Sequence, residues 1–276
     1  MTDGAASAEP ATRPLAVVLD KELDTPFTHG TLASLPQWLR ADDTGTPKVR
    51  AVGGPGWPER LRAALASQPR AVLLSGPTPS APETVRELAE LAGSARVPVV
   101  VDSPWALHPA VADALPALRE AVSQEALVEI FTAVDKSPVT ALLDQLALIR
   151  TLLGAPSALR VTRLDEHGHG ALGEYGNVFV SFSGARSAVG TTDTRLVLRG
   201  AGEQWRIGFG DPRIARPADV VRIDDGGEHR LPTLYETAHR AAWRHTHAAA
   251  NGAESPHTLH HLAADLALLP VGALGL

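Results

Sequence analysis

The sequence lacks cysteine and has few lysines, and both shortages exclude chemistry. Without cysteine the 276-residue chain has no disulfide, no thiol nucleophile and no thiolate ligand for zinc or an iron–sulfur cluster. Lysine is rare among the 25 basic residues and occurs at Lys21, Lys48 and Lys136. A mechanism that depends on a lysine side chain therefore has only these candidates.

Basic runs and long apolar runs are also missing. The formal net charge is −6, which is opposite to the footprint of a protein that neutralises nucleic-acid phosphates. No stretch reaches the roughly 18 apolar residues that span a bilayer. Residues 1–13 lack the charged and apolar regions of a signal peptide and are expected to form a disordered tail. We expect a cytoplasmic protein without nucleic-acid or membrane partners.

The first half of the chain alternates between short apolar runs and amphipathic runs. Continuous apolar strands joined by helices predict a parallel sheet that is covered on both faces. The expected strands are Leu15–Asp20, Val49–Val52, Ala71–Ser75, Val97–Asp102 and Leu127–Val134, and the expected helices are Leu32–Ala41, Pro58–Ser67, Ala81–Gly93 and Pro109–Ser123.

The rhythm changes after a long apolar helix, Val139–Leu153, which Ser137 and Pro138 open and Gly154 ends. Strands then follow one another without helices, as in an antiparallel meander with one packed face. They are expected at Leu159–Leu164, Asn177–Phe182, Arg186–Thr192, Arg195–Leu198 and Gln204–Ile207, before helices at Leu231–Ala250 and Ser255–Leu269, the second of which Ser255 and Pro256 are expected to cap. The fold class is α/β: a Rossmann-like, doubly wound parallel sheet (14–125), followed by an α+β domain with an open antiparallel sheet (126–276).

Glycine-rich turns give little support for dinucleotide binding. The string Gly168-x-Gly170-x-x-Gly173 lies between strands in the second half and is predicted to be a hairpin loop. The turn after the first strand, Asp20–Gly30, holds acids that repel a pyrophosphate. A second glycine-rich turn, Gly53–Gly56, has no acidic residue that would hold a ribose.

Histidines and acids are candidates for metal ligands and catalysts. We assign no metal site, because solvated or helix-end histidines explain the pattern more simply than a zinc site. The acid Asp144 could face a cleft, but it shares a helix side with Thr140 and Thr151, which favours a solvated face. The candidates were His257 and His261 with His260, His245 and His247 one helix earlier, and the segment Asp165–His169, which is expected to be a polar hairpin loop.

The strand ends are more informative, because ligands of open α/β sheets bind beyond the carboxyl ends of the strands. We predict cofactor-binding residues in two small, proline-containing turns; ordinary turn chemistry is the alternative. These residues are Ser75, Gly76, Pro77 and Thr78 after the third strand, and Asp102, Ser103 and Pro104 after the fourth.

This layout resembles the Gfo/Idh/MocA-type oxidoreductases, from about Arg13 onward. Ser75–Thr78 is similar to the family's Ala-Thr-Pro-Asn turn, and Asp102–Pro104 to its Glu-Lys-Pro strand end. The segment Leu196–Trp205 is similar to its Gly-Thr-x-Gly hairpin, and His29 stands where the family often has a histidine. The resemblance implies a Rossmann domain before an open sheet, NAD or NADP as cofactor, and hydride chemistry.

The chain departs from the family at the residues that carry this chemistry. The glycine fingerprint after the first strand is missing, and Ser103 replaces the lysine of Glu-Lys-Pro. If Leu142–Gly154 is the catalytic helix, Asp144 and Ala147 stand at its histidine and aspartate positions. In another register that helix is deleted. No catalytic residue can therefore be assigned, and Lys136 is the one conceivable substitute for the lysine.

Two functions from different classes follow. The first is a catalytically degenerate homologue that acts as a binding or assembly protein, with a homo-oligomer formed through the C-terminal sheet or with a protein partner. The alternative is an active NAD(P)-dependent oxidoreductase on a sugar or polyol. A lyase or isomerase that uses Asp144 or the histidines is a third, more remote reading.

Overall fold

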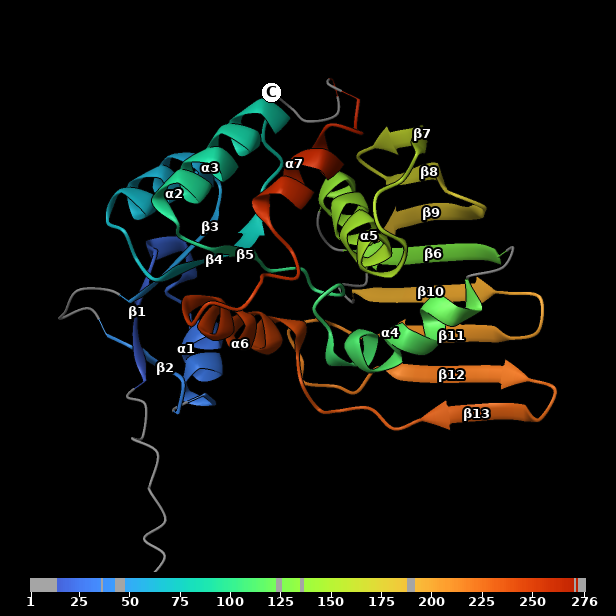
Figure 1. Cartoon of the computed structure of the whole chain (residues 1–276). Helices are drawn as coiled ribbons and strands as arrows, with labels where there is room; N and C mark the ends of the chain where they lie inside the picture. Colours follow the sequence, from blue (N-terminus) through green and yellow to red (C-terminus); the bar gives the residue numbers. More distant parts are fainter. Residues whose placement is uncertain are drawn as a thin grey trace, which may run out of the picture.

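The computed structural model describes residues 14–35, 37–42, 48–122, 126–134, 137–187, 192–270 and 272. Residues 1–13, expected to be a disordered tail, lie outside them. The described part contains a parallel sheet and a larger mixed sheet side by side (Figure 1). The predicted fold class is thus confirmed. The division of the chain at residue 126 stays a prediction.

The parallel sheet has the strand order β2-β1-β3-β4-β5. Helices α2 and α3 cover one face, and α1 and α6 the other (Figure 1). Because helices cover both faces of this sheet, most residues along its strands are apolar. The elements are β1 (Leu15–Leu19), η1 (Lys21–Leu23), α1 (Pro26–Ala33), β2 (Leu39–Ala41), β3 (Val49–Gly54), α2 (Trp57–Ala66), β4 (Ala71–Pro77), α3 (Pro82–Ala95) and β5 (Val99–Val101).

The large sheet has the order β13-β12-β11-β10-β6-β9-β8-β7 and is antiparallel except where β6 pairs with β9. Alternate side chains face helices α4 and α5, and the others face outward. The elements are α4 (Pro109–Ala121), β6 (Ala126–Val134), α5 (Pro138–Leu153), β7 (Ala158–Asp165), β8 (Gly168–Tyr175), β9 (Val178–Arg186), β10 (Asp193–Arg199), β11 (Gln204–Phe209), β12 (Asp219–Asp224), β13 (Gly227–Leu231), α6 (Ala238–Ala250) and α7 (Leu259–Leu266).

The two C-terminal helices return to the parallel sheet. Trp243 of α6 is fully buried in the cluster that covers β1, β3 and β5. Helix α7 packs against α3 on one side and α5 on the other. A bidentate ion pair joins Arg150 of α5 to Asp265 of α7, whose side chains are 12% and 2% exposed. Apolar packing therefore runs without a break from the first sheet to the second.

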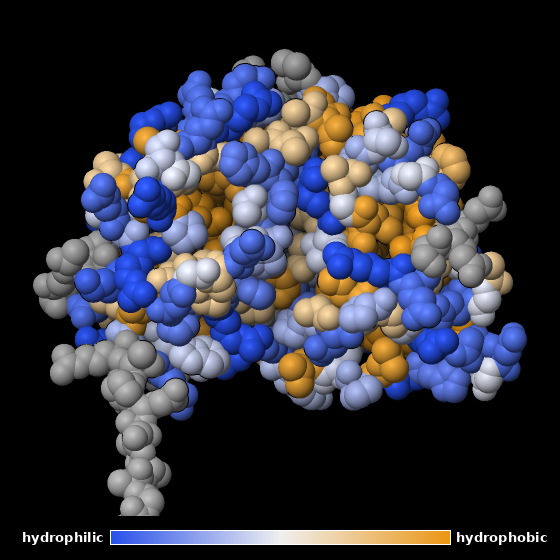
Figure 2. All heavy atoms as spheres, viewed as in Figure 1, coloured by the Kyte–Doolittle hydropathy of each residue, from blue (hydrophilic) through white to orange (hydrophobic). Residues whose placement is uncertain are grey.

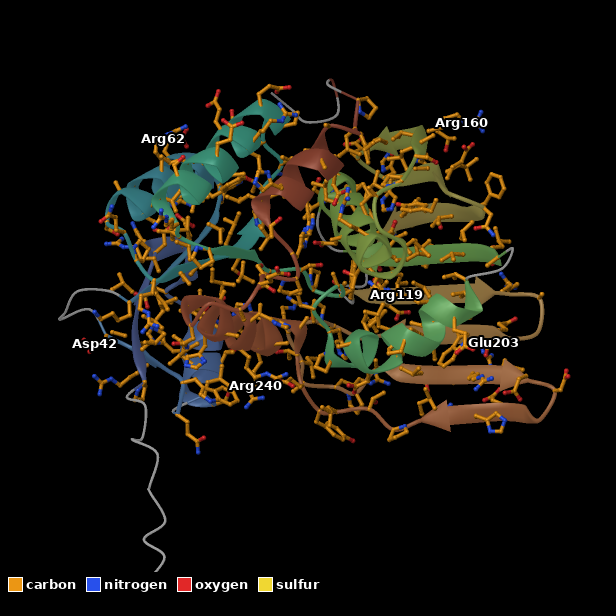
Figure 3. All side chains as sticks on the ribbon, in the orientation of Figure 1. Asp42, Arg62, Arg119, Arg160, Glu203 and Arg240 are labelled. Atoms are coloured by element: carbon orange, nitrogen blue, oxygen red, sulfur yellow. The ribbon has the colours of Figure 1, made fainter. Side chains whose placement is uncertain are left out.

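The outer surfaces are polar where the sequence predicts it. Hydrophilic residues cover the outward sides of α2 and α3 in Figure 2. Arg62 on α2 and Arg160 on β7 point away from the body of the protein (Figure 3). No helix among the described residues is both long enough and apolar enough to cross a membrane.

Several predicted elements were wrong in place or partner. The helix expected at Leu32–Ala41 ends at Ala33, because Thr25 caps an earlier start at Pro26 and residues 39–41 form β2. The strand at Leu127–Val134 belongs to the large sheet as β6, and not to the parallel sheet. The helix expected from Leu231 begins at Ala238, after β13, which was not foreseen, nor was β12.

Two turn predictions were also wrong. The glycines Gly168–Gly173 lie in β8, where a Cβ on Gly168 would stand 2.3 Å from the Gly184 carbonyl oxygen of β9. The lack of a side chain at Gly168 thus allows β8 and β9 to approach closely at this point. Helix α7 is capped by the Thr258 hydroxyl, not by Ser255-Pro256. The strand predicted at Arg186–Thr192 falls partly outside the described residues.

Candidate functional site

A cavity of about 340 Å³ lies between the two sheets, at the carboxyl ends of β4 and β5. Six of the seven predicted cofactor-binding residues line it: Ser75, Gly76, Pro77, Asp102, Ser103 and Pro104. Thr78 is not among the lining residues; its carbonyl accepts a hydrogen bond of 2.8 Å from the Trp57 indole of α2. The turns are thus brought together, while their role in holding a cofactor stays a prediction.

A chain of hydrogen bonds links α6 to these strand ends. The Trp243 Nε1–H donates to His239 Nε2 over 3.1 Å. Indole nitrogen is only a donor, so His239 Nε2 is the acceptor in this bond, and Nδ1 is the ring nitrogen that donates. Its Nδ1 lies 2.5 Å from Asp102 Oδ2, which also accepts from the Ser75 hydroxyl at 2.9 Å. Asp102 Oδ2 is therefore the shared acceptor of these two hydrogen bonds.

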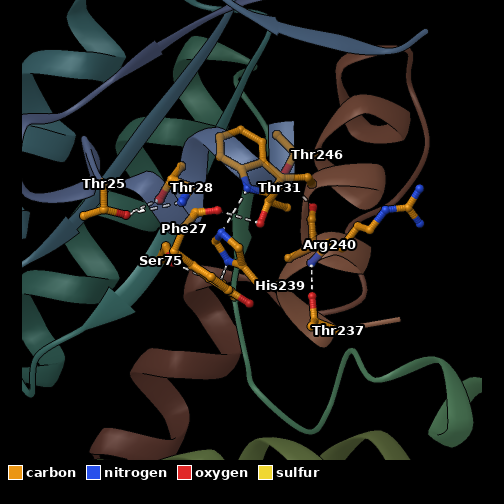
Figure 4. A network of polar contacts seen from close by, with 12 residues as sticks. Thr25, Phe27, Thr28, Thr31, Ser75, Thr237, His239, Arg240 and Thr246 are labelled. Carbon is orange, nitrogen blue, oxygen red and sulfur yellow. Dashed lines mark hydrogen bonds and ion pairs between the residues drawn. The ribbon is translucent and has the colours of Figure 1, made fainter. Parts of the chain in front are cut away.

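His239 is placed by α6 and by α1. Thr237 caps α6, and its side chain accepts from the Arg240 amide. The imidazole stacks on Phe27 of α1 with ring centroids 5.2 Å apart. In Figure 4 His239 reaches from α6 toward Ser75. Sequence reasoning missed this residue, because no local pattern reveals that a C-terminal helix packs beside the strand ends.

His257 was considered as a metal ligand and as a remote catalytic candidate, and the structure places it at the cavity. It precedes α7, is 5% exposed and lines the cavity, and neither ring nitrogen has a hydrogen-bond partner. Burial, followed by the influence of His261 and Arg150, lowers its pKa to about 3. His257 does lie at a helix end, directly before the Thr258 cap of α7, but the expectation that it is solvated was wrong. His261, with which it was paired, lies on α7.

Helix α5 contributes the far wall. Thr140, Leu143, Asp144 and Ala147 line the cavity. Asp144 was expected on a solvated face, and it lies on the helix face that lines this cavity. Polar residues one turn apart on an otherwise apolar helix were therefore a usable signal of a cavity. Ser103, at the position of the family lysine, is 1% exposed, and its hydroxyl accepts from the Ala106 amide at 3.3 Å. That hydroxyl closes its own turn.

Charged side chains of the chain itself stand where open α/β sheets usually hold a dinucleotide. In a sheet of this strand order the crevice lies beyond β1 and β3, where the order reverses. Arg60 of α2 bonds the Asp20 carboxylate and the Gly53 carbonyl. A Cβ on Gly54 would stand 3.3 Å from the Cβ of Glu22. Arg60 is committed to Asp20, and the Glu22 carboxylate adds negative charge, so these residues do not fit a pyrophosphate.

Comparisons with known proteins give the fold. No protein-family model matches the chain, and no curated protein does. Among solved structures it is similar to the UDP-N-acetylglucosamine 3-dehydrogenase of Acidithiobacillus ferrooxidans, with 14% identity over 91% of this chain and 94% of that one, and a TM-score of 0.72.

Two further similar structures were solved with nicotinamide cofactors. A 3-ketoreductase from Actinomadura kijaniata, in complex with NADP, is 12% identical over 92% of this chain and 86% of that one, with a TM-score of 0.65. An oxidoreductase from Agrobacterium radiobacter, with NAD+, L-tartaric acid and magnesium, has the same identity and coverage and a TM-score of 0.62. The chain thus has the fold of these oxidoreductases.

Proposed function

We propose that this chain is a catalytically degenerate relative of the Gfo/Idh/MocA-type oxidoreductases that acts as a binding or assembly protein. Its large sheet joins a second copy of the chain, and it does not hold NAD or NADP at the strand crevice. One observation carries the proposal: large apolar side chains stand exposed on the outward face of that sheet.

These side chains form what we call the apolar sheet patch: Leu127, Phe131, Leu172 and Phe179, exposed by 42%, 45%, 46% and 61%. Leu127 and Phe179 are register partners on adjacent strands. With Leu172 they also line one surface groove. Leu127, Leu172 and Phe179 therefore form a cluster, and exposed apolar clusters mark interaction sites in soluble proteins, whereas single scattered residues need no explanation.

A second copy is the occupant that the charges favour. The part of the large sheet next to the patch, strands β10 to β13, carries both positively and negatively charged side chains. Arg206 pairs with Glu228 at 2.5 Å, and Arg230 with Asp219 at 3.2 Å. A surface with both signs can meet its own copy across a two-fold axis, which places each charge near its opposite.

The absence of hydride chemistry is supported by the cavity. Ser103 occupies the lysine position with its hydroxyl turned into the strand-end turn. Asp144 and Ala147 replace the family's histidine and aspartate in the register that the cavity favours. The alternative, an active NAD(P)-dependent oxidoreductase on a sugar or polyol, requires a dinucleotide where Arg60 and Glu22 lie.

Sedimentation of the purified chain tests the assembly. We expect a reversible dimer whose mass falls toward that of one chain on dilution. A strict monomer at the highest soluble concentration, without a protein that co-purifies, would contradict the proposal.

A further inference from the structure

We propose that a groove on the outward face of the large sheet binds the phosphoryl group of a small molecule, between the guanidinium groups of Arg195 and Arg216. The groove lies on strands β10 to β13 and has a volume of about 510 Å³, which is within the usual range of small-molecule sites. None of the residues that line it belongs to the apolar sheet patch. Ligand binding there is thus an activity apart from the proposed self-association.

Two glycines give the groove its floor. Gly208 of β11 is the register partner of Arg195 of β10, so a hollow lies beside this arginine where another residue would place a side chain. A Cβ on Gly208 would meet the Cβ of Asp219 at 3.8 Å, and no other atom within 4 Å. A Cβ on Gly210 would stand 3.3 Å from Cδ and 4.0 Å from Nη1 of Arg216. The Arg216 side chain therefore lies over Gly210, and the two arginines flank one hollow.

Arg195 and Arg216 are the cations of the groove that the protein leaves uncommitted. Among the described residues, no acid lies within ion-pair distance of either side chain. Asp193 is the one acid of the groove that has no cation, and it offsets part of their charge. With four arginines against three acids, the groove is net positive. The other two arginines each hold an acid, in the ion pairs Arg206–Glu228 and Arg230–Asp219.

Two guanidinium groups from different segments favour a phosphoryl group over a carboxylate. One guanidinium fork matches the two oxygens of a carboxylate, whereas a phosphoryl group has three oxygens and can accept from a second fork as well. A long polyanion is disfavoured, because the chain as a whole has a formal charge of −6. Val221 and Pro217 also line the groove and offer apolar surface to an organic group on the phosphate. A single phosphoryl group, free or in a monoester, is thus the ligand that suits the groove.

Titration calorimetry of the full chain with three anions tests the proposal. Inorganic phosphate, phenyl phosphate and benzoate are compared at constant ionic strength and about pH 8, where both phosphates are dianions. We expect both phosphates to bind saturably and benzoate to bind at least about tenfold more weakly. Tighter binding of phenyl phosphate assigns the groove to a monoester, and equal or weaker binding assigns it to free phosphate. No saturable phosphate binding, or benzoate that binds as tightly as phenyl phosphate, would overturn the proposal.

Charge variants assign the binding to the groove. Arg195→Gln and Arg216→Gln should each weaken phosphate binding about tenfold, because each removes a charge-assisted donor. Asp193→Asn removes a repulsive charge and should tighten binding roughly threefold. Arg62 on α2 is the matched control, since it is exposed and points away from the protein (Figure 3), and Arg62→Gln should bind like wild type. Unchanged affinity in either groove arginine variant, or an equal loss in Arg62→Gln, would refute the assignment.

A variant of the floor separates a shaped site from diffuse attraction. Gly208→Val keeps every charge and fills the hollow from an outward strand position that a β-branched side chain suits, so it should abolish phosphate binding. Wild-type affinity in this variant, once its far-UV spectrum matches wild type, would contradict the proposal. Sedimentation of the same samples reports the dimer separately. Phosphate binding without a dimer refutes only the proposed self-association, and a dimer without phosphate binding refutes only the phosphoryl site.

Discussion

Replacing Phe179 by aspartate should break the proposed dimer, because this side chain is the most exposed member of the apolar sheet patch. A phenylalanine offers roughly 200 Å² of surface, and 61% of that of Phe179 is exposed, which leaves about 120 Å² to bury. At ~25 cal/mol per Å² this is about 3 kcal/mol in each copy. A two-fold interface contains the residue twice, so about 6 kcal/mol is lost, before any penalty for burying the new carboxylate.

A loss of this size raises the dimer Kd by about four orders of magnitude. Sedimentation velocity across a dilution series should therefore find Phe179→Asp monomeric wherever the wild type is dimeric. Tyr235→Asp is the matched control, since Tyr235 is 79% exposed but lies outside the large sheet. If Phe179→Asp dimerised like wild type, or if Tyr235→Asp alone became monomeric, the interface would lie elsewhere.

Three further predictions concern stability. Arg150→Met should lower the free energy of unfolding by about 3–5 kcal/mol, because it leaves the buried Asp265 carboxylate without its cation, and adding Asp265→Leu should restore much of this in urea titrations. Trp243→Phe removes the donor to His239 Nε2 and should cost about 1–2 kcal/mol beyond any packing loss; an unchanged urea midpoint would contradict the hydrogen bond. Acid should destabilise the fold as pH falls from about 6.5 to about 4, because three buried histidines with lowered pKa stay neutral in the native state but protonate when unfolded. These histidines are His108 and His169, with a pKa of about 4, and His257, with a pKa of about 3. Calorimetry at pH 5 should thus record a Tm well below that at pH 7, whereas an equal Tm at both pH values would refute the burial of these histidines.

The sequence predicted the parallel strands and the long helix α5 because their signals are local. Strands β4 and β5 contain continuous apolar runs, and α5 has a proline at its start and Gly154 at its end. Strand partnership is not local. Nothing in Leu127–Val134 distinguishes a strand of the parallel sheet from the centre of the large sheet, where it lies.

Only the strand-end turns of the candidate site were predictable from the sequence. The turns at Ser75 and Asp102 follow from the rule that strand ends hold ligands. His239 and His257 reach the same cavity from α6 and from the segment before α7. Their positions depend on packing between distant parts of the chain: His239 and Asp102, which are hydrogen-bonded, are 137 residues apart in the sequence. Asp144 carried a local signal, a polar residue on an apolar helix, but its face could not be assigned without the neighbouring sheet.

A cofactor-binding measurement tests the central claim, that Arg60, Asp20 and Glu22 prevent a dinucleotide from binding beyond β1 and β3. The Tm is recorded with NAD+, NADH, NADP+ and NADPH, each at about 1 mM, where a Kd near 10 µM would add about 2.7 kcal/mol of stability. The account predicts no change in Tm with any of them. A concentration-dependent rise with one cofactor would contradict it and favour an active NAD(P)-dependent oxidoreductase.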